Sequence, residues 1–520
     1  MKTRPILQTP RPQGHENPAA EINPRRVAAM IAELPLLNAR SSLRSLLGGI
    51  LPTNEQQLPP RLRWRLLELY RPPTLTLSGP GGAERAEQEE ARRTDGGRML
   101  RALADGYKLL VKDLLEADGR KSGAWLAAAL HRALEITAST LLHAFRHHAA
   151  TEPFVWLDLH QLFLLGHELG IAEGTPVLER KTLDERTLLD RYRQILVTAI
   201  LDPYHLAKGE LDRLHDLLAP LVGECILGPA GEDLPQGCFL IDPGADSPPL
   251  SRSQVRQGAA GSWVLDPRPL LIQLQTRTRN LGRPAAGAQI PELRLVEILE
   301  ARLGHPRARR SPRERRRRQA HAALGLAAAR HFLGLDPASL AAAMRESSAP
   351  IEVRDLDRAD APDHTLEACT VLNSSVEGHM LAFAGRVAEQ ARVGQLLALF
   401  LPGPGGSGNS GSAPRPQLGE IRWLRRTRED RTEMGFRLIP GTPAAVACRS
   451  VDFDLEVATG LLLPALPALE LPPRIIVEPD TLRPGQRLNL EPAEPPRAVV
   501  GEVLAEGETQ VQFALHCDSA

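Results

Sequence analysis

The stretch Asn373-Ser374-Ser375-Val376-Glu377-Gly378 decides how the second half of this chain is interpreted. It has the form Asn-x-Ser-x-x-Gly and separates two segments, 368–372 and 379–383, that have the composition of strands. An amide, a hydroxyl and a glycine at a strand-to-strand corner offer side-chain donors and exposed backbone N–H groups to an anion. Taken alone, the same residues also make an ordinary polar hairpin turn.

A dense arginine run precedes this stretch. Residues 305–318 contain eight Arg and one Glu, a local charge of +7, although the whole chain has a formal net charge of zero. Guanidinium groups hold phosphate in a bidentate way and stack on aromatic rings, and guanine O6 and N7 suit the same donor fork. Arg309 and Arg313, like Arg313 and Arg317, have the spacing Arg-x-x-x-Arg. A solvated basic linker would produce the same run.

The segments around these motifs predict a small antiparallel barrel, because short strand-like runs alternate with turn signals. Such runs occur at 320–326, 368–372, 379–383, 396–401, 420–425, 434–440 and 444–448. Two helices are expected between the first two strands, up to about residue 333 and at 337–346. The Gly- and Pro-rich stretch 402–416 is expected to be a long hairpin loop.

Together, Arg-x-x-x-Arg before a small barrel and Asn-x-Ser-x-x-Gly between two of its strands resemble the signature of PilZ domains, which bind cyclic di-GMP. Gly419 and Trp423, followed by Gly435-Phe436, match a hairpin that is common in that family. The resemblance covers about residues 307–450. It implies a nucleotide site formed by Arg309, Arg310, Arg313, Arg317, Asn373, Ser375 and Gly378.

A second arginine pair competes for this role. Arg354 and Arg358 also have the spacing Arg-x-x-x-Arg and lie only 15 positions before Asn373, whereas Arg317 lies 56 positions before it. In PilZ domains about one hairpin separates the two motifs. The later pair leaves too little chain for a preceding strand and the turn at Pro362, so the earlier cluster is favoured, with an inserted helical segment. Which arginines face the ligand stays open.

The chain as a whole is predicted to be an α+β multidomain protein. Its 520 residues are too many for one core, and aromatic residues are only 4% of the total, so aliphatic cores are expected. Apolar residues at helical spacing predict an irregular helical bundle, with an exposed loop at 79–97 and a helix break at Pro203. The expected parts are a disordered lead-in (1–22), a helical domain (23–223), a mixed connecting region (224–304), the barrel with its helical insertion (305–450) and a β-rich C-terminal segment (451–520).

Several classes of protein are disfavoured by the sequence. It contains no apolar run long enough to span a membrane and no secretory h-region, so a cytoplasmic protein is expected. Its five cysteines are scattered, without a CxxC pair, and it has neither a phosphate loop nor a Gly-x-Ser-x-Gly elbow. His143 and His147 share a helix face but are expected to be structural. We therefore expect no metal, no cofactor and no enzymatic activity.

The resemblance to PilZ domains implies a regulatory protein that binds cyclic di-GMP and passes its level to a protein partner. Because some PilZ proteins are linked to pilus or flagellar control, the resemblance implies the type IV pilus machinery and twitching motility as the setting. One alternative is a helical adaptor or scaffold whose degenerate barrel does not bind nucleotide. Another makes the arginine run a contact to nucleic acid, with binding that weakens steeply with salt. Affinity, partner and oligomeric state stay open.

Overall fold

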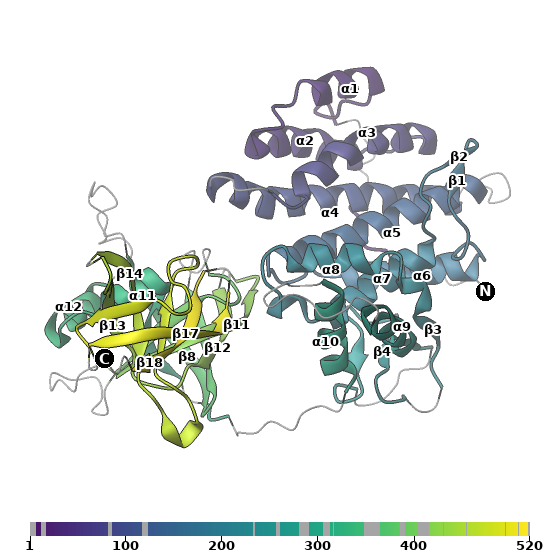
Figure 1. The fold of residues 1–520 in the computed structure, drawn as a ribbon. Helices are drawn as coiled ribbons and strands as arrows, with labels where there is room; N and C mark the ends of the chain where they lie inside the picture. Colours follow the sequence, from purple (N-terminus) through teal and green to yellow (C-terminus); the bar gives the residue numbers. More distant parts are fainter. Residues whose placement is uncertain are drawn as a thin grey trace. The chain divides into compact units, whose positions relative to one another are not determined.

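The computed structural model describes residues 7–11, 17–81, 86–116, 123–231, 234–255, 261–279, 291–304, 313–315, 317–347, 364–384, 391–402, 415–429, 431–453, 455–493, 496–507 and 509–517. The chain forms two compact units. The first comprises residues 1–203 and 209–307, and the second comprises residues 204–208 and 308–520. The first is mainly helical and the second mainly β (Figure 1). An α+β multidomain fold is thus confirmed.

Two long helices form the centre of the first unit. These are α4 (Ala86–Glu116) and α5 (Gly123–Arg146), which lie side by side (Figure 1). The apolar residues at helical spacing between Leu100 and Leu114 of α4 form a buried stripe. Around them pack α2 (Ala39–Asn54), α3 (Pro60–Ser78), α6 (Val155–Glu168), α7 (Leu188–Ile200) and α8 (Glu210–Leu218), and α1 (Pro24–Ala32) packs against α3.

The mixed region that follows the helices is a small sheet with two helices. Strands β3 (Ile226–Pro229), β4 (Phe239–Ile241), β5 (Leu250–Ser251) and β6 (Trp263–Asp266) pair in the order β3-β6-β4-β5. Helices α9 (Arg268–Arg279) and α10 (Pro291–Leu303) pack against each other. A two-stranded ladder, β1 (Val177–Leu178) with β2 (Lys181–Thr182), precedes α7. The predicted break at Pro203 is confirmed, because only a short 3₁₀ turn (Pro203–His205) separates α7 from α8.

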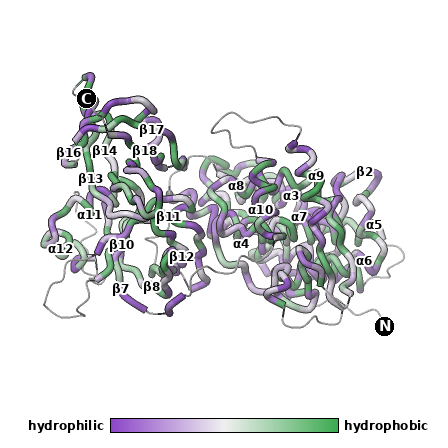
Figure 2. Tube along the Cα trace, turned by 60° about the horizontal axis from the view of Figure 1, so that its bottom comes forward, coloured by the Kyte–Doolittle hydropathy of each residue, from purple (hydrophilic) through white to green (hydrophobic). Residues whose placement is uncertain are grey.

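The second unit contains two closed, six-stranded barrels. The first barrel has the ring order β10-β11-β12-β9-β8-β7 and the second β13-β14-β15-β18-β17-β16. Figure 2 shows hydrophobic and hydrophilic residues in both barrels, and along the first strand of the second barrel buried positions alternate with less buried ones. The strands of the first are β7 (Arg318–Leu324), β8 (Glu367–Ser375), β9 (Gly378–Ala384), β10 (Leu396–Leu401), β11 (Arg415–Arg426) and β12 (Arg431–Leu438). The second is formed by β13 (Ala444–Ser450), β14 (Glu456–Leu463), β15 (Arg474–Val477), β16 (Arg487–Glu491), β17 (Arg497–Glu506) and β18 (Val511–Cys517).

The predicted helical insertion is confirmed. Between β7 and β8 the chain forms α11 (Leu326–Leu333) and α12 (Pro337–Ser347). Helix α11 packs against β7 and β10 of the first barrel and against β13 and β14 of the second. The insertion therefore explains the long separation between the two sequence motifs and also joins the barrels.

Three local predictions are wrong. The expected loop at 79–97 already belongs to α4 from Ala86, because the Glu- and Ala-rich residues 86–91 favour a helix and Glu87 and Glu89 lie in its first turn. The strand at 444–448 belongs to the second barrel, where it pairs with β14 and β16. In the lead-in, Leu7 is buried rather than disordered.

Gln8 in the lead-in is held by a buried ion pair. Lys108 on α4 and Asp158 on α6 are each about 1% exposed at the side chain and lie 2.5 Å apart. The Lys108 ammonium donates to the Gln8 carbonyl at 2.7 Å, and Asp158 Oδ1 accepts from the Gln8 N–H at 2.8 Å. Both backbone groups of Gln8 therefore satisfy charges that water cannot reach.

Candidate functional site

The hexapeptide 373–378 forms the end of the β8–β9 hairpin, as the sequence predicts. Ser375 pairs with Gly378 across the ladder, so Val376 and Glu377 are the two residues of the turn. The Val376 side chain is 84% exposed. The corner therefore stands at the surface of the first barrel, where a ligand can reach it.

Gly378 is required by the packing of two neighbouring strands. Gly378 on β9 lies opposite Arg437 on β12, and a Cβ added there would lie 2.0 Å from the Phe436 carbonyl oxygen. Since no side chain fits at that distance, the glycine lets β12 approach the corner closely. The packing of β12 therefore explains why a glycine stands at position 378, whether or not a ligand approaches the backbone there.

The described end of the arginine run, residues 313–315 and 317–318, lies directly beside this corner. Glu314 and Ser374 exchange two backbone hydrogen bonds, from Glu314 N to Ser374 O at 2.8 Å and from Ser374 N to Glu314 O at 3.0 Å. Farther along, Arg318 pairs with Val371 where β7 meets β8. Residues 313–315 and 317–318 therefore extend along the end of β8, and two motifs 56 positions apart meet as neighbouring segments.

The register places the two motifs on one face. Val371 belongs to the barrel core, and Asn373 pairs with Met380 after a bulge, so Asn373 and Ser375 share the opposite, outer face. Directly paired residues point to the same side, so Glu314 shares the side of Ser374. By alternation, Arg313 takes the side of Asn373 and Ser375.

Arg317 occupies the same outer face. Arg318 pairs with the core residue Val371, and its neighbour Arg317 therefore points outward by the strand period of two. Arg313 and Arg317 are both exposed. Two of the predicted arginines and two polar residues of the corner thus lie together.

The polar side chains of the corner make only weak hydrogen bonds within the protein. In the described part of the chain, the Asn373 amide contacts the Met380 sulfur at 3.3 Å, a weak acceptor, and Ser375 Oγ donates to the Gly378 carbonyl at 3.2 Å. Much of the hydrogen-bonding capacity of Asn373 is available to a ligand.

A histidine supports the corner from the inner side of the strands. The His379 ring contacts Ser374 Oγ at 2.9 Å and Gln417 Oε1 at 2.8 Å, and it stacks on Phe436. Burial lowers the pKa of His379, against the opposing effect of the Gln417 contact. The imidazole is therefore held neutral and fixes the Ser374 side chain. His379 was not predicted as a site residue. Its position directly after Gly378 and its spacing of two from Leu381 would have placed it beside the corner on the inner side of the strand.

The remaining predicted arginines lie outside the described residues. These are Arg309 and Arg310, and also the competing pair Arg354 and Arg358.

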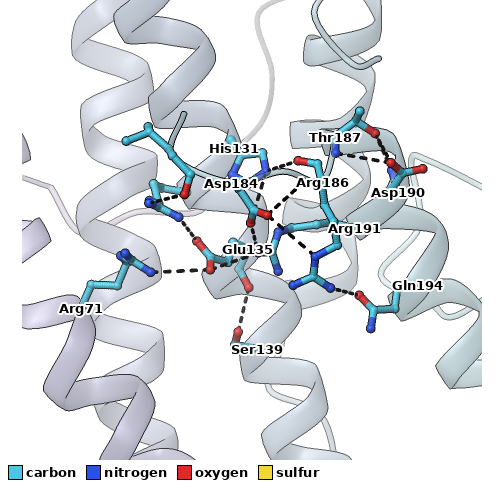
Figure 3. Close-up of polar contacts among 12 residues, drawn as sticks. Arg71, His131, Glu135, Ser139, Asp184, Arg186, Thr187, Asp190, Arg191 and Gln194 are labelled. Atoms are coloured by element: carbon cyan, nitrogen blue, oxygen red, sulfur yellow. Dashed lines mark hydrogen bonds and ion pairs between the residues drawn. The ribbon is translucent and has the colours of Figure 1, made fainter. Parts of the chain in front are cut away.

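The helical unit contains a network of charged side chains that is internally paired (Figure 3). Glu135 on α5 accepts from Arg132 at 2.7 Å and lies 3.7 Å from Arg71 and 3.5 Å from Arg191. Burial would raise the pKa of Glu135, but the three arginines hold it below its usual value. Asp184 pairs with Arg191 in the same network. These contacts join α3, α5 and α7, so the network is a structural element.

His143, one of the two histidines singled out by spacing, has a structural role. His143 is buried, and its ring nitrogens contact the carbonyl oxygens of Ser78 at 3.2 Å and Arg93 at 3.0 Å. It therefore joins α5 to α3 and α4. Within the described residues there is no group of three or more His, Cys, Asp or Glu that could hold a metal ion. Among the same residues, no helix combines the length and apolarity needed to cross a bilayer.

Three histidines of the helical unit predict a loss of stability in acid. Burial lowers the pKa of His131, His160 and His215 to about 4, whereas an unfolded histidine titrates near 6.5. Between these values the unfolded chain binds protons that the folded chain does not, so stability falls as pH falls from about 6.5 to about 4. For fully buried His160 the loss is on the order of 3 kcal/mol.

Urea unfolding of the full chain, followed by circular dichroism between pH 7 and pH 4, measures this loss. The variant His160→Gln removes one titrating group and should flatten the dependence. An unfolding midpoint that does not change over this pH range would show that these histidines are already charged in the fold.

The comparisons with known proteins cover both the helical and the β-rich part of the chain. Residues 25–230 match the family described as "Cyclic-di-GMP receptor FimW, N-terminal domain". Over 98% of its length, the chain is 24% identical to the cyclic-di-GMP receptor FimW of Pseudomonas aeruginosa, and the match covers 92% of that protein. The chain is therefore similar, along its helical and its β-rich parts alike, to a cyclic di-GMP receptor of the FimW type.

Proposed function

We propose that this protein is a receptor for cyclic di-GMP and that the first barrel binds the nucleotide. Arg313 and Arg317 contact its phosphates and guanines, and Asn373, Ser375 and Gly378 form the facing corner. Arg309 and Arg310, which precede them in the sequence, are proposed as further contacts to the nucleotide. The observation that carries the proposal is the pair of backbone hydrogen bonds between Glu314 and Ser374, because they hold both motifs against each other.

The chemistry of the corner suits this ligand. Cyclic di-GMP carries two phosphates and two guanines, and guanidinium groups bind both: phosphate oxygens by paired N–H donors, and guanine through O6 and N7. Glu314 interrupts the run, but its side chain takes the side of Ser374 by the same register. The outer face therefore presents cations and neutral donors together.

The signal passes to a protein partner, and we propose that the helical unit docks it. The match to the FimW N-terminal domain covers this unit, and binding at the barrel would bias docking by favouring one state of the chain. Type IV pilus assembly, and with it twitching motility, is the setting that we propose. Copurification of pilus components with the full chain, in the presence and absence of cyclic di-GMP, tests that setting.

Titration calorimetry of the full chain with cyclic di-GMP tests the proposed ligand. We expect saturable binding by the unmodified protein. Asn373→Ala should weaken it by about tenfold, since a hydrogen bond to a charged group contributes about 1.5 kcal/mol or more. The exposed helix residue Arg345, changed to alanine, is the control and should leave affinity unchanged. No binding at about 1 mM nucleotide would contradict the proposal.

A further inference from the structure

The two barrels of the second unit have the same strand topology. In each barrel, the first strand pairs with the second and fourth, the third pairs with the second and sixth, and the fifth lies between the fourth and sixth. Every one of these pairings is antiparallel. Residues 444–517 are therefore a second barrel of the same design as the one that carries the hexapeptide.

The second barrel lacks the polar features of the first. Its corner between the second and third strands is the stretch 464–473, Pro-Ala-Leu-Pro-Ala-Leu-Glu-Leu-Pro-Pro, which contains no Asn, Ser or Gly. No arginine occurs between β12 and β13, where the run would have to stand. The second barrel thus has the fold of the first but neither its Asn-x-Ser-x-x-Gly corner nor its arginine run. We therefore expect it to have a different role.

A hydrophobic cluster joins the two barrels, in addition to the core inside each of them. Helix α11 lies at its centre, with the buried side chains Ala329 and Phe332. The outer face of the first barrel contributes Ala323, Leu396, Ala398, Phe400 and Leu418, and the second barrel contributes Leu461, Leu463 and Ile476. Close packing of this kind transmits displacement instead of absorbing it.

The hexapeptide corner is bonded to the connector between the barrels. The Glu377 carbonyl accepts from Leu438 N at 2.9 Å, and Gly378 faces Arg437 across the ladder. The connector then continues through Ile439, which donates its N–H to the Leu418 carbonyl. A displacement of the main chain at the corner therefore acts directly on Leu438, the first residue of the connector 438–441.

The second barrel reaches back to the same connector through one buried arginine. Arg474, the first residue of β15, is 4% exposed and donates to the Pro440 carbonyl at 2.6 Å. In the described residues no carboxylate pairs with it, and its Nε has no hydrogen-bond partner. Burial lowers the pKa of Arg474. A buried guanidinium held by this one hydrogen bond among the described residues is costly, so its position depends closely on the Pro440 carbonyl.

We propose that the second barrel is the readout module for the nucleotide corner, and that Arg474 couples it to the connector 438–441. This proposal rests on the proposed function, because the corner must first bind its ligand. Cyclic di-GMP that engages the corner alters the hydrogen bond between Glu377 and Leu438. The connector shifts with Leu438, and Arg474 follows the Pro440 carbonyl. The ligand thus favours one of two arrangements of the connector.

Hydrogen exchange measured by mass spectrometry on the full chain, with and without cyclic di-GMP, tests the coupling. In the unmodified protein, exchange should slow in peptides that contain 373–378. It should also change by about fivefold or more in peptides that contain 464–477, which is the lower end of common coupling strengths. An effect at the corner with no change at 464–477 would overturn the readout proposal alone. No effect at the corner would overturn the proposed function as well.

The variant Arg474→Met isolates the coupling residue. It keeps a long side chain and removes the donor, so the corner should still be protected while the effect at 464–477 disappears. Arg483→Met, an exposed position on the same barrel, is the matched control and should keep both effects. Retention of the full distant effect in Arg474→Met would remove Arg474 from the path. If this variant does not fold, the comparison in the unmodified protein still decides the proposal.

Discussion

Replacing both Arg313 and Arg317 by alanine is expected to weaken binding of cyclic di-GMP by about 100-fold or more. A hydrogen bond to a charged group contributes about 1.5–3 kcal/mol, and each guanidinium makes at least one such bond to a phosphate or guanine. Both arginines are exposed, so the change should leave the stability of the barrel nearly intact. Titration calorimetry of the full chain measures the affinity.

Two comparison variants make this result specific. Arg483→Ala with Arg497→Ala removes the same charge from exposed positions of the second barrel and should leave affinity unchanged. Arg354→Ala with Arg358→Ala removes the competing pair and should also have little effect. If Arg354→Ala with Arg358→Ala abolished nucleotide binding and Arg313→Ala with Arg317→Ala did not, the nucleotide site would have been assigned to the wrong arginines.

Replacing Asp158 by leucine is expected to destabilise the helical unit by about 3–5 kcal/mol. The change leaves Lys108 buried with a single carboxylate, Asp105 at 2.8 Å, and removes the acceptor of the Gln8 N–H. Breaking one side of a buried ion pair costs this much because the other charge stays out of water. Urea unfolding followed by circular dichroism measures the loss.

A double variant separates the charge from the packing. Lys108→Met with Asp158→Leu removes both charges, so it should be less destabilising than Asp158→Leu alone. Glu168→Ala, an exposed change on the same helix, should alter stability by less than about 0.5 kcal/mol. A cost below about 1 kcal/mol for Asp158→Leu would mean that the pair contributes little to the fold.

Much of the fold could be predicted from local sequence patterns. The helical stripes, the strands of the first barrel and the two helices between β7 and β8 follow from periodicity and turn residues, which act over a few positions. The hexapeptide turn was predicted for the same reason. These features depend on neighbouring residues and can be read without knowledge of the partners across the sheet.

Pairings between distant segments could not be read in this way. Strand β13 has an alternating pattern that suits either barrel, and only its pairing with β14 and β16 assigns it to the second. The burial of the lead-in depends on Lys108 and Asp158, up to 150 positions away. The same holds for the candidate site. Its residue types could be predicted from the sequence, but the Glu314–Ser374 bridge that brings them together could not.

The most direct test of the account is a crystal structure of the full chain with cyclic di-GMP. The account predicts density for the nucleotide on the outer face of the first barrel, with Arg313 and Arg317 on one side and Asn373 and Ser375 on the other. Nucleotide bound to the second barrel or to the helical unit, with this corner empty, would contradict it.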